Sequence, residues 1–234
     1  MKHAFLSIII LIISSILFTS CHPSNNKEKD KTDQKITKKE AIDTFFVKIK
    51  GEKASIIPGK SIGVIQVGKR TQEINKLHLG QPSKSNAGMC KSLNRWTYGM
   101  DSTHFKNLTI FSECSGKDSM RPHIQWVRTN DPKFRTKNNL QIGSNLKAIK
   151  SIYDTLILVA TYHVKDSSLV NILSAPKKGI TFEINTEDNQ MSSQDSCLAL
   201  IVHSVSQQIP GYYFSFYNDL KLKAQPEMVI PAKN

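Results

Sequence analysis

The sequence predicts an α+β fold of two tandem units, each a helix packed on an antiparallel β-sheet. The first reason is a short internal sequence repeat, each copy of which we call an echo. Residues 65–78 read IQVGKRTQEINKLH, and residues 140–153 read LQIGSNLKAIKSIY. The second reason is that strand-like segments follow each echo. A helix followed by a meander of strands occurs twice, and this pattern predicts that each helix covers one face of a sheet.

Each echo reads as a short apolar stretch, a turn at glycine and a helix. Gly68 and Gly143 permit the tight turn, because glycine readily adopts a positive φ. Ser144 is a natural N-cap for the second helix, since its hydroxyl can accept a first-turn N–H. Ile74 and Ile149 lie with other apolar residues at helical spacing, which predicts one buried face on each helix.

The strands are expected in meanders after each helix. We expect them at roughly 89–100, 106–114 and 122–129 in the first unit, and at 155–164, 179–185, 197–206 and 212–217 in the second. Ile180, Phe182 and Ile184 alternate with polar residues, which is typical of a half-buried antiparallel strand.

The domain boundaries follow from changes in composition. Residues 44–135 are predicted to form the first unit, residues 136–223 the second, and residues 224–234 a loose C-terminal tail. Residues 21–43 are rich in lysine and poor in large apolar residues. They are therefore interpreted as a flexible tether.

The first 20 residues have the features of a secretory signal. Lys2 precedes the apolar run FLSIIILIISSILF, which is shorter than the roughly 20 residues of a transmembrane helix. The sequence LFTSC, ending at Cys21, resembles the lipobox of bacterial lipoproteins, although Phe18 stands where leucine is usual. The resemblance implies removal of residues 1–20 and attachment of a diacylglyceryl group to the Cys21 sulfur. We therefore expect a lipid-anchored protein of the bacterial cell envelope, on the periplasmic or surface side of the outer membrane.

The charge is strongly basic. Removing one lysine with the signal leaves a net charge of 31 − 19 = +12. In an envelope, the anions available to such a protein are phospholipid, lipopolysaccharide and acidic glycans, whereas export argues against nucleic acid as a partner. The lysines are scattered, which is also typical of a solvated basic surface.

Three cysteines remain after the lipid-bearing Cys21, and an exported protein meets an oxidising compartment. We expect a disulfide between Cys90 and Cys114, because they lie on neighbouring predicted strands with the same parity. Such a bridge contributes roughly 3 kcal/mol through the unfolded state. Cys197, in the apolar run SCLALIV, is expected to be a buried free thiol.

Catalytic signatures are incomplete. Gly59-Lys60-Ser61 resembles the end of a phosphate-binding loop, but Ala54 stands where that pattern needs glycine, and a strand-like segment follows. Ser144 and Lys147 match Ser-x-x-Lys, yet the chain lacks the Ser-Asp-Asn and Lys-Thr-Gly motifs that accompany it.

The histidines and cysteines lack metal-ligand spacing, so no metal and no cofactor is expected. Folding could bring two histidines together, and His163 with His203 is the best pair. Structural or surface roles remain the simpler interpretation.

Aromatic side chains suggest a contact surface. In GYYFSFY, alternate residues face opposite sides, and one face carries two tyrosines, which suit interfaces. The predicted possible binding surface comprises Tyr213, Tyr217, Trp96 and Trp126. Packing within the core is the alternative.

The tandem pattern and the Ile-Gly entry to each helix resemble SmpA/OmlA-like assembly lipoproteins and beta-lactamase-inhibitor-like proteins. No functional residue carries over from either family. The expected anchor, the tether, the duplicated pattern and the absence of linked catalytic motifs favour a non-enzymatic envelope protein that binds another protein or a cell-wall component. The beta-lactamase-inhibitor resemblance implies one version of it, an inhibitor or immunity protein that presents a sheet surface to an enzyme. The alternative is an envelope hydrolase acting on glycans or peptides.

Overall fold

The computed structural model describes part of the chain. The described residues are 54–100, 105–114, 120–163, 169–186, 190–207 and 223–231, of which Met100 and 223–231 are described by backbone alone. The chain divides into two compact units, Met1–Thr37 and Lys38–Asn234, and every described residue belongs to the second.

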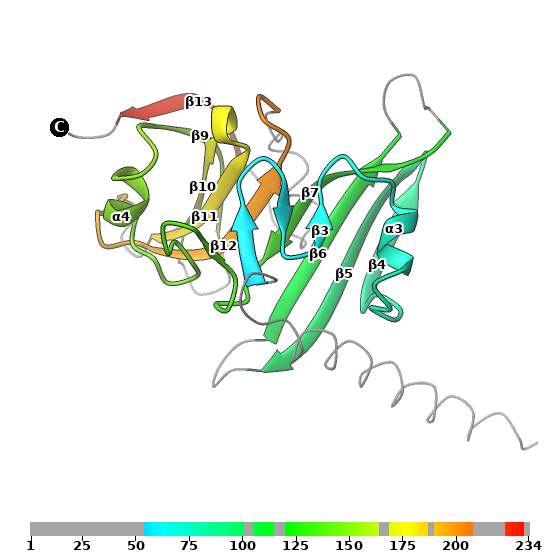
Figure 1. Ribbon diagram of the computed structural model, residues 1–234. Coiled ribbons are helices and arrows are strands. Elements are labelled where there is room, and N and C mark those ends of the chain that lie inside the picture. Colours follow the sequence, from blue (N-terminus) through cyan, green and yellow to red (C-terminus); the bar gives the residue numbers. More distant parts are fainter. Residues whose placement is uncertain are drawn as a thin grey trace, which may run out of the picture. The chain divides into compact units, whose positions relative to one another are not determined.

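Most described residues form strands of two sheets (Figure 1). The smaller sheet has the order β3-β2-β1-β8, with β1 (Ser55–Ile57), β2 (Ser61–Ile62), β3 (Ile65–Gln66) and β8 (Arg135–Thr136). The larger sheet has the order β13-β9-β10-β11-β12-β7-β6-β5-β4. Its strands are β4 (Lys84–Gly88), β5 (Lys91–Met100), β6 (Phe105–Glu113), β7 (His123–Thr129), β9 (Thr155–His163), β10 (Leu169–Ala175), β11 (Ile180–Thr186), β12 (Ser196–His203) and β13 (Lys223–Pro231).

The larger sheet consists of two four-strand meanders, β4–β7 and β9–β12, with β13 added beside β9. The meanders join through antiparallel pairing of β12 with β7, where Leu200 lies opposite Thr129 and Val202 opposite Val127. The joined meanders therefore form one continuous antiparallel sheet rather than two separate ones.

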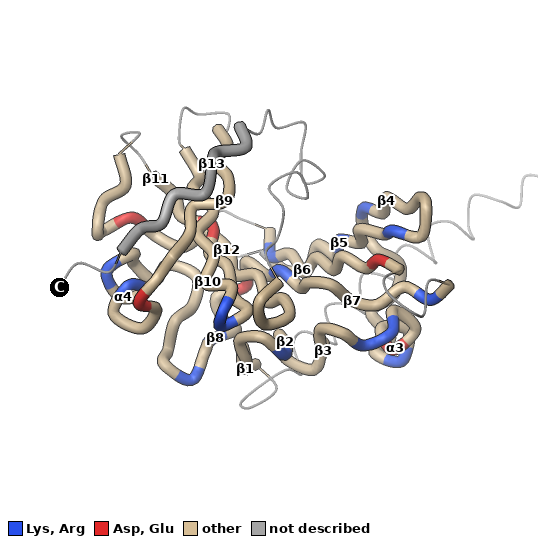
Figure 2. Tube along the Cα trace, turned by 90° about the horizontal axis from the view of Figure 1, so that it is seen from above, with Lys and Arg blue, Asp and Glu red and all other residues tan. Residues whose placement is uncertain are grey.

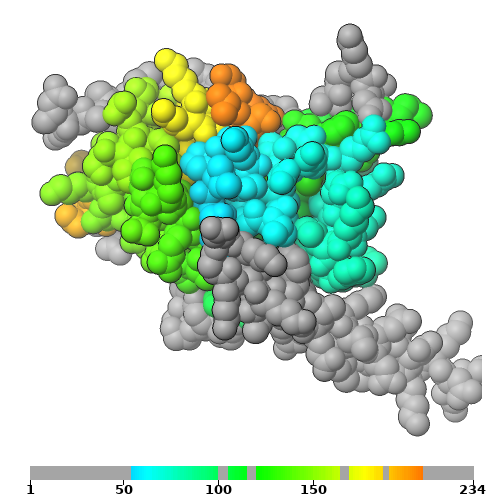
Figure 3. Space-filling model, viewed as in Figure 1, coloured from blue at the N-terminus to red at the C-terminus, as the bar shows by residue number. Residues whose placement is uncertain are grey.

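The predicted α+β fold of helix-on-sheet units is wrong. The described α-helices are α3 (Gln72–Asn75) and α4 (Leu146–Lys150), with a 3₁₀ turn, η2, at Pro176–Lys178. About one turn of helix cannot cover a four-stranded sheet. Buried side chains of the smaller sheet share the core instead, and its strands lie across the face of the larger sheet that Figures 1 and 3 present.

The main core lies between the larger sheet, the smaller sheet and the two helices. Ile56 and Ile62 come from the smaller sheet, Ile149 from α4, and Phe182 and Leu200 from the larger sheet, all with exposed fractions of 2% or less. A second cluster of buried apolar side chains comprises Leu93, Phe111, Trp126, Val159, Ala160, Ile172 and Ile201. Burial of both clusters supplies the main driving force for folding.

The expected strands coincide with β5, β6, β7, β9, β11 and β12 to within a few residues. The range 212–217 lies outside the described residues. The predicted strands do not include β4 or β10. The segment that contains β2 and β3 is strand-like in sequence, but a separate smaller sheet is not predicted. Residues 223–231, at the predicted tail, form β13 in the structure.

The Gly59-Lys60-Ser61 segment has a packing role. Gly59 donates its N–H to the carbonyl of Gly179 at 3.0 Å, where the β1–β2 turn meets the turn before β11. A Cβ on Gly179 would lie 2.5 Å from the Gly59 Cα and 2.5 Å from the His203 carbonyl oxygen. Only glycines permit this close crossing of two backbones.

No helix among the described residues has the length and apolar character needed to span a membrane.

Candidate functional site

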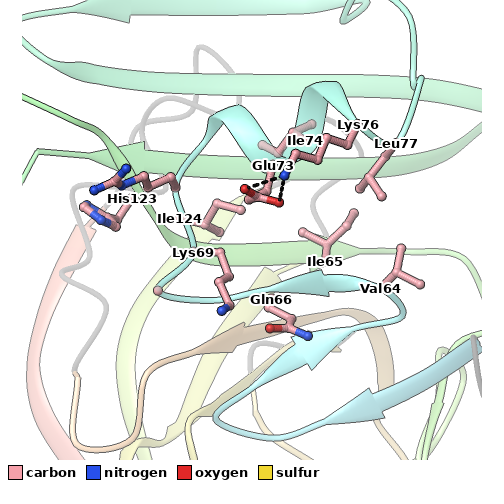
Figure 4. Close-up of a pocket in the computed structure, with 12 residues that line it drawn as sticks. Val64, Ile65, Gln66, Lys69, Glu73, Ile74, Lys76, Leu77, His123 and Ile124 are labelled. Carbon is pink, nitrogen blue, oxygen red and sulfur yellow. Dashed lines mark hydrogen bonds and ion pairs between the residues drawn. The ribbon is translucent and has the colours of Figure 1, made fainter.

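A groove of about 710 Å³ lies between β3 and α3 and is bounded by the start of β7 (Figure 4). Its lining residues are Val64, Ile65, Gln66, Gly68, Lys69, Arg70, Glu73, Ile74, Lys76, Leu77, His123 and Ile124. We call this the β3–α3 groove. Figure 4 shows Val64, Ile65 and Leu77 gathered at one end and His123 at the other, with Lys69 between them.

The β3–α3 groove is basic. Lys69, Arg70 and Lys76 are exposed cations, and Glu73 is the single carboxylate of the lining. The Lys76 Nζ lies 2.9 Å from a Glu73 carboxylate oxygen, but the two side chains are 71% and 50% exposed, so the pair contributes little stability. Figure 2 shows this basic stretch between β3 and α3.

Backbone hydrogen bonds hold residues 68–71, beside the β3–α3 groove, against the start of β7. Gly68, at a φ of 79°, donates its N–H to the Ile124 carbonyl at 2.7 Å. The Ile124 N–H donates to Lys69 at 2.8 Å, and the Thr71 N–H donates to Pro122 at 3.0 Å. The cationic side chains therefore project from a fixed backbone.

The second echo is held to β12 by the same set of bonds. Gly143, at a φ of 85°, donates to Cys197 at 2.8 Å, and Cys197 donates to Ser144 at 2.9 Å. Leu146 then donates to Asp195 at 2.8 Å. An isolated bridge pairs Arg70 with His123 in the first echo, and one pairs Asn145 with Ser196 in the second.

These correspondences define two equivalent pieces of backbone. We call residues 65–78 the first turn segment and residues 140–153 the second turn segment. The N-cap of α4 is Asn145, whose Oδ1 accepts the Ala148 N–H at 2.9 Å, and not the predicted Ser144. Ser144 turns back instead, and its Oγ accepts the Gln141 N–H at 2.9 Å.

A second groove, of about 530 Å³, lies on the other side of α3 and is neutral in charge. Its lining residues are Thr71, Ile74, Asn75, His78, Leu79, Gly80, Gln81, Pro82, Ser85, Asn94 and Trp96. Trp96 is 4% exposed and donates its indole N–H to the Gly80 carbonyl at 3.2 Å. This indole is a structural support of the groove wall.

A buried ion pair links the two meanders. Arg128 of β7 donates to both carboxylate oxygens of Glu183 on β11, at 2.6 and 2.7 Å, and the Tyr162 hydroxyl donates to the same carboxylate at 3.1 Å. The side chains of Arg128 and Glu183 are 13% and 2% exposed. Such a bidentate, hydrogen-bonded arrangement suits a structural pair that spans β12, the strand between β7 and β11.

Another buried contact joins Tyr98 of β5 to Asp131. The tyrosine hydroxyl donates to the carboxylate at 3.2 Å, and Asp131 is fully buried beside Lys106 and Lys133, each at 3.9 Å. Burial, and then the Asp131 charge, raise the pKa of Tyr98 well above its usual value. Tyr98 therefore stays a hydrogen-bond donor at physiological pH.

The favoured histidine pair does not form. His163 is exposed on β9, and His203 is buried on β12, with β10 and β11 between them. The His203 Nε2 lies 3.1 Å from the Thr181 hydroxyl, which donates to Ser174 at 2.9 Å. Burial lowers the pKa of His203, so the ring is neutral and structural at neutral pH.

The cysteine prediction is confirmed. Cys90 and Cys114 form a disulfide, and Cys197 is free and buried. The two cysteines lie just outside the strands on which they were expected: Cys90 is exposed in the β4–β5 turn, and Cys114 follows the last residue of β6. Burial raises the pKa of the Cys197 thiol far above its usual value, so this cysteine is unreactive.

The other predicted site residues divide into two groups. Trp96 and Trp126 are buried, and Trp126 stacks on Phe111 with ring centroids 5.4 Å apart. Both indoles are therefore packing residues in the described fold. Cys21, Tyr213 and Tyr217 lie outside the described residues, and their roles stay predictions.

Comparison with protein-family models, with curated proteins and with solved structures finds no match, so the site is interpreted from its own geometry. Within the described ranges, no group of three or more His, Cys, Asp or Glu side chains is placed to hold a metal ion.

Sequence reasoning missed the β3–α3 groove. Lys69 and Lys76 belong to the lysines that are scattered along the sequence, and neither Arg70 nor His123 is a predicted site residue. The signal was present in the echo itself, because the two segments differ in charge where they agree in pattern.

Proposed function

We propose that the protein is a lipid-anchored, non-enzymatic component of the bacterial cell envelope that binds another protein. The observation that carries this proposal is the β3–α3 groove, an open and basic surface on a fixed backbone. Charged grooves of this kind speed and orient the encounter with an oppositely charged partner.

The expected anchor complements the groove. A diacylglyceryl group on Cys21, followed by the polar tether of residues 21–43, would hold the folded part near a membrane while leaving its surfaces accessible. Replacing Cys21 with alanine is expected to move the protein from the membrane fraction to the soluble fraction. Retention of the Cys21→Ala protein in membranes would contradict the anchor.

Partner binding is tested by photo-crosslinking from the groove in intact cells. A benzophenone amino acid is placed at Gln66 in the groove or at Gln141, the equivalent position of the second turn segment. We expect a discrete protein adduct from Gln66 and a much weaker one, or none, from Gln141. The absence of any protein adduct from either position would contradict the proposed function.

A further inference from the structure

The charged side chains of the β3–α3 groove have no charged counterparts in the second turn segment. The backbone hydrogen bonds align each residue of the first turn segment with the residue 75 places later in the chain. They align His123 with the residue 73 places later. The aligned pairs are Lys69 with Ser144, Arg70 with Asn145, Glu73 with Ala148, Lys76 with Ser151, and His123 with Ser196.

Positions that shape the backbone and the core are kept. Glycine stands at the turn in both segments, and Ile74 and Ile149 are buried in the same core. Gln66 likewise corresponds to Gln141. The fold therefore needs the glycine and the apolar residues, whereas the second segment makes the same bonds without the charges.

The second turn segment has lysines, but at other positions. Lys147 and Lys150 correspond to Gln72 and Asn75, and neither of these lines the β3–α3 groove. The difference between the segments is thus the placement of charge at the groove, not the amount of charge on a helix.

From this comparison we infer that the β3–α3 groove binds an acidic peptide segment with an apolar side chain, contributed by the partner protein. The inference rests on the proposed function and names its ligand. Carboxylates of the segment meet Lys69, Arg70 and Lys76, whose charges complement them. The apolar side chain packs at the end of the groove formed by Val64, which is 40% exposed, and Leu77.

This division of the groove favours a peptide over the other anions of an envelope. A polyanionic glycan would have no use for the apolar end. A phospholipid in a bilayer presents its headgroup and keeps its acyl chains inside, so it would contact the cations alone. The groove places apolar and cationic side chains within one opening (Figure 4). A peptide of mixed acidic and apolar residues uses both ends.

The matched variant converts the first segment to the residues of the second. It combines Lys69→Ser, Arg70→Asn, Glu73→Ala, Lys76→Ser and His123→Ser, and we call it the copy-matched variant. These residues already occupy the equivalent backbone in the second segment, so folding is expected to survive. The control variant, Lys137→Ser with Lys177→Ser, removes the same net charge from exposed positions outside the groove.

Binding is measured by fluorescence anisotropy on the full-length protein. The probe is a short fluorescein-labelled peptide of alternating glutamate and leucine, and its comparison peptide has glutamine for glutamate. We expect the copy-matched variant to bind the acidic peptide roughly five- to tenfold more weakly than the wild type, and the control variant to bind it as the wild type does. Added salt should weaken the wild-type binding.

Three results would overturn the inference. The first is an equal loss of affinity for the acidic peptide in the copy-matched and control variants. The second is binding of the glutamine peptide as tight as that of the acidic peptide. The third is binding of the Cys21→Ala protein to phosphatidylglycerol vesicles but not to the acidic peptide. If the Gln66 crosslink forms in both the wild type and the copy-matched variant, the ligand inference fails while the proposed function stands. If the crosslinks themselves are absent, the proposed function fails.

Discussion

The two turn segments have the same backbone and different surfaces. Each has a glycine with positive φ that donates to a strand of the larger sheet, a return bond from that strand, and a short helix with a buried isoleucine. The first segment adds three cations beside a groove, and the second places small neutral residues at those positions. One chain thus contains its own reference for what the fold requires.

Comparing the two turn segments separates structural residues from candidate functional ones within a single chain. Residues that agree between the segments, such as Gly68 with Gly143, explain the backbone. Residues that differ in charge, such as Lys69 with Ser144, need another explanation.

The largest loss of stability is expected where the two meanders are joined. Replacing Arg128 with alanine leaves the Glu183 carboxylate buried beside Tyr162 without its cation, which should destabilise the protein by about 3–5 kcal/mol. Urea unfolding measures the loss. An apolar double variant, Arg128→Met with Glu183→Leu, should recover most of it, because no buried charge remains. A loss below about 1 kcal/mol for Arg128→Ala would show that the pair does not hold the meanders together.

The next effect distinguishes a crowded glycine from an open one. Gly179→Ala adds a methyl group 2.5 Å from two backbone atoms at a φ of 69°, so it should cost roughly 2–5 kcal/mol. Gly143→Ala has the positive φ but no atom within 4 Å of the new Cβ, so about 1–2 kcal/mol is expected. Equal losses of stability in the Gly179→Ala and Gly143→Ala proteins, measured by thermal unfolding, would contradict the close crossing of Gly179 with Gly59.

A smaller, pH-dependent effect is expected from His203, on β12 of the second meander. Burial lowers the pKa of this histidine, so above its ordinary pKa of about 6.5 the ring is neutral in both states and contributes no pH dependence. Below that pH the unfolded chain takes up the proton first, and the fold loses up to about 1.4 kcal/mol per pH unit. The urea midpoint should therefore fall from pH 7 to pH 5 more steeply in the wild type than in a His203→Gln variant. Parallel curves for the two proteins would exclude this role of His203.

Periodicity in the sequence predicted the strands that have an obvious pattern and missed those without one. The alternation of Ile180, Phe182 and Ile184 placed β11 correctly. β10 was missed because Asn171 and Ser174 interrupt its apolar run. In the fold these side chains are buried and paired, Asn171 with the hydroxyls of Thr161 and Thr186. Such partners lie on other strands, so a local pattern cannot reveal them.

The architecture and the candidate site depended on information that is not local. The helices are about one turn long, and backbone bonds to β7, β12 and the residues before these strands hold their segments. The two- and three-residue strands of the smaller sheet are too brief to show a period. The β3–α3 groove combines residues 64–77 with His123, some 50 positions away. The bridge of Arg70 with His123 and the backbone bonds beside it bring these residues together in the fold.

The central claim is that the charges of the first turn segment serve binding and not folding. The most direct test measures the free energy of unfolding and the affinity for the acidic peptide in the same preparation of the copy-matched variant. We predict an unfolding free energy within about 2 kcal/mol of the wild type, because each of the five surface substitutions contributes at most about 0.5 kcal/mol, together with the weakened binding. A variant that loses several kcal/mol of stability, or that binds the peptide as tightly as the wild type, would contradict the claim.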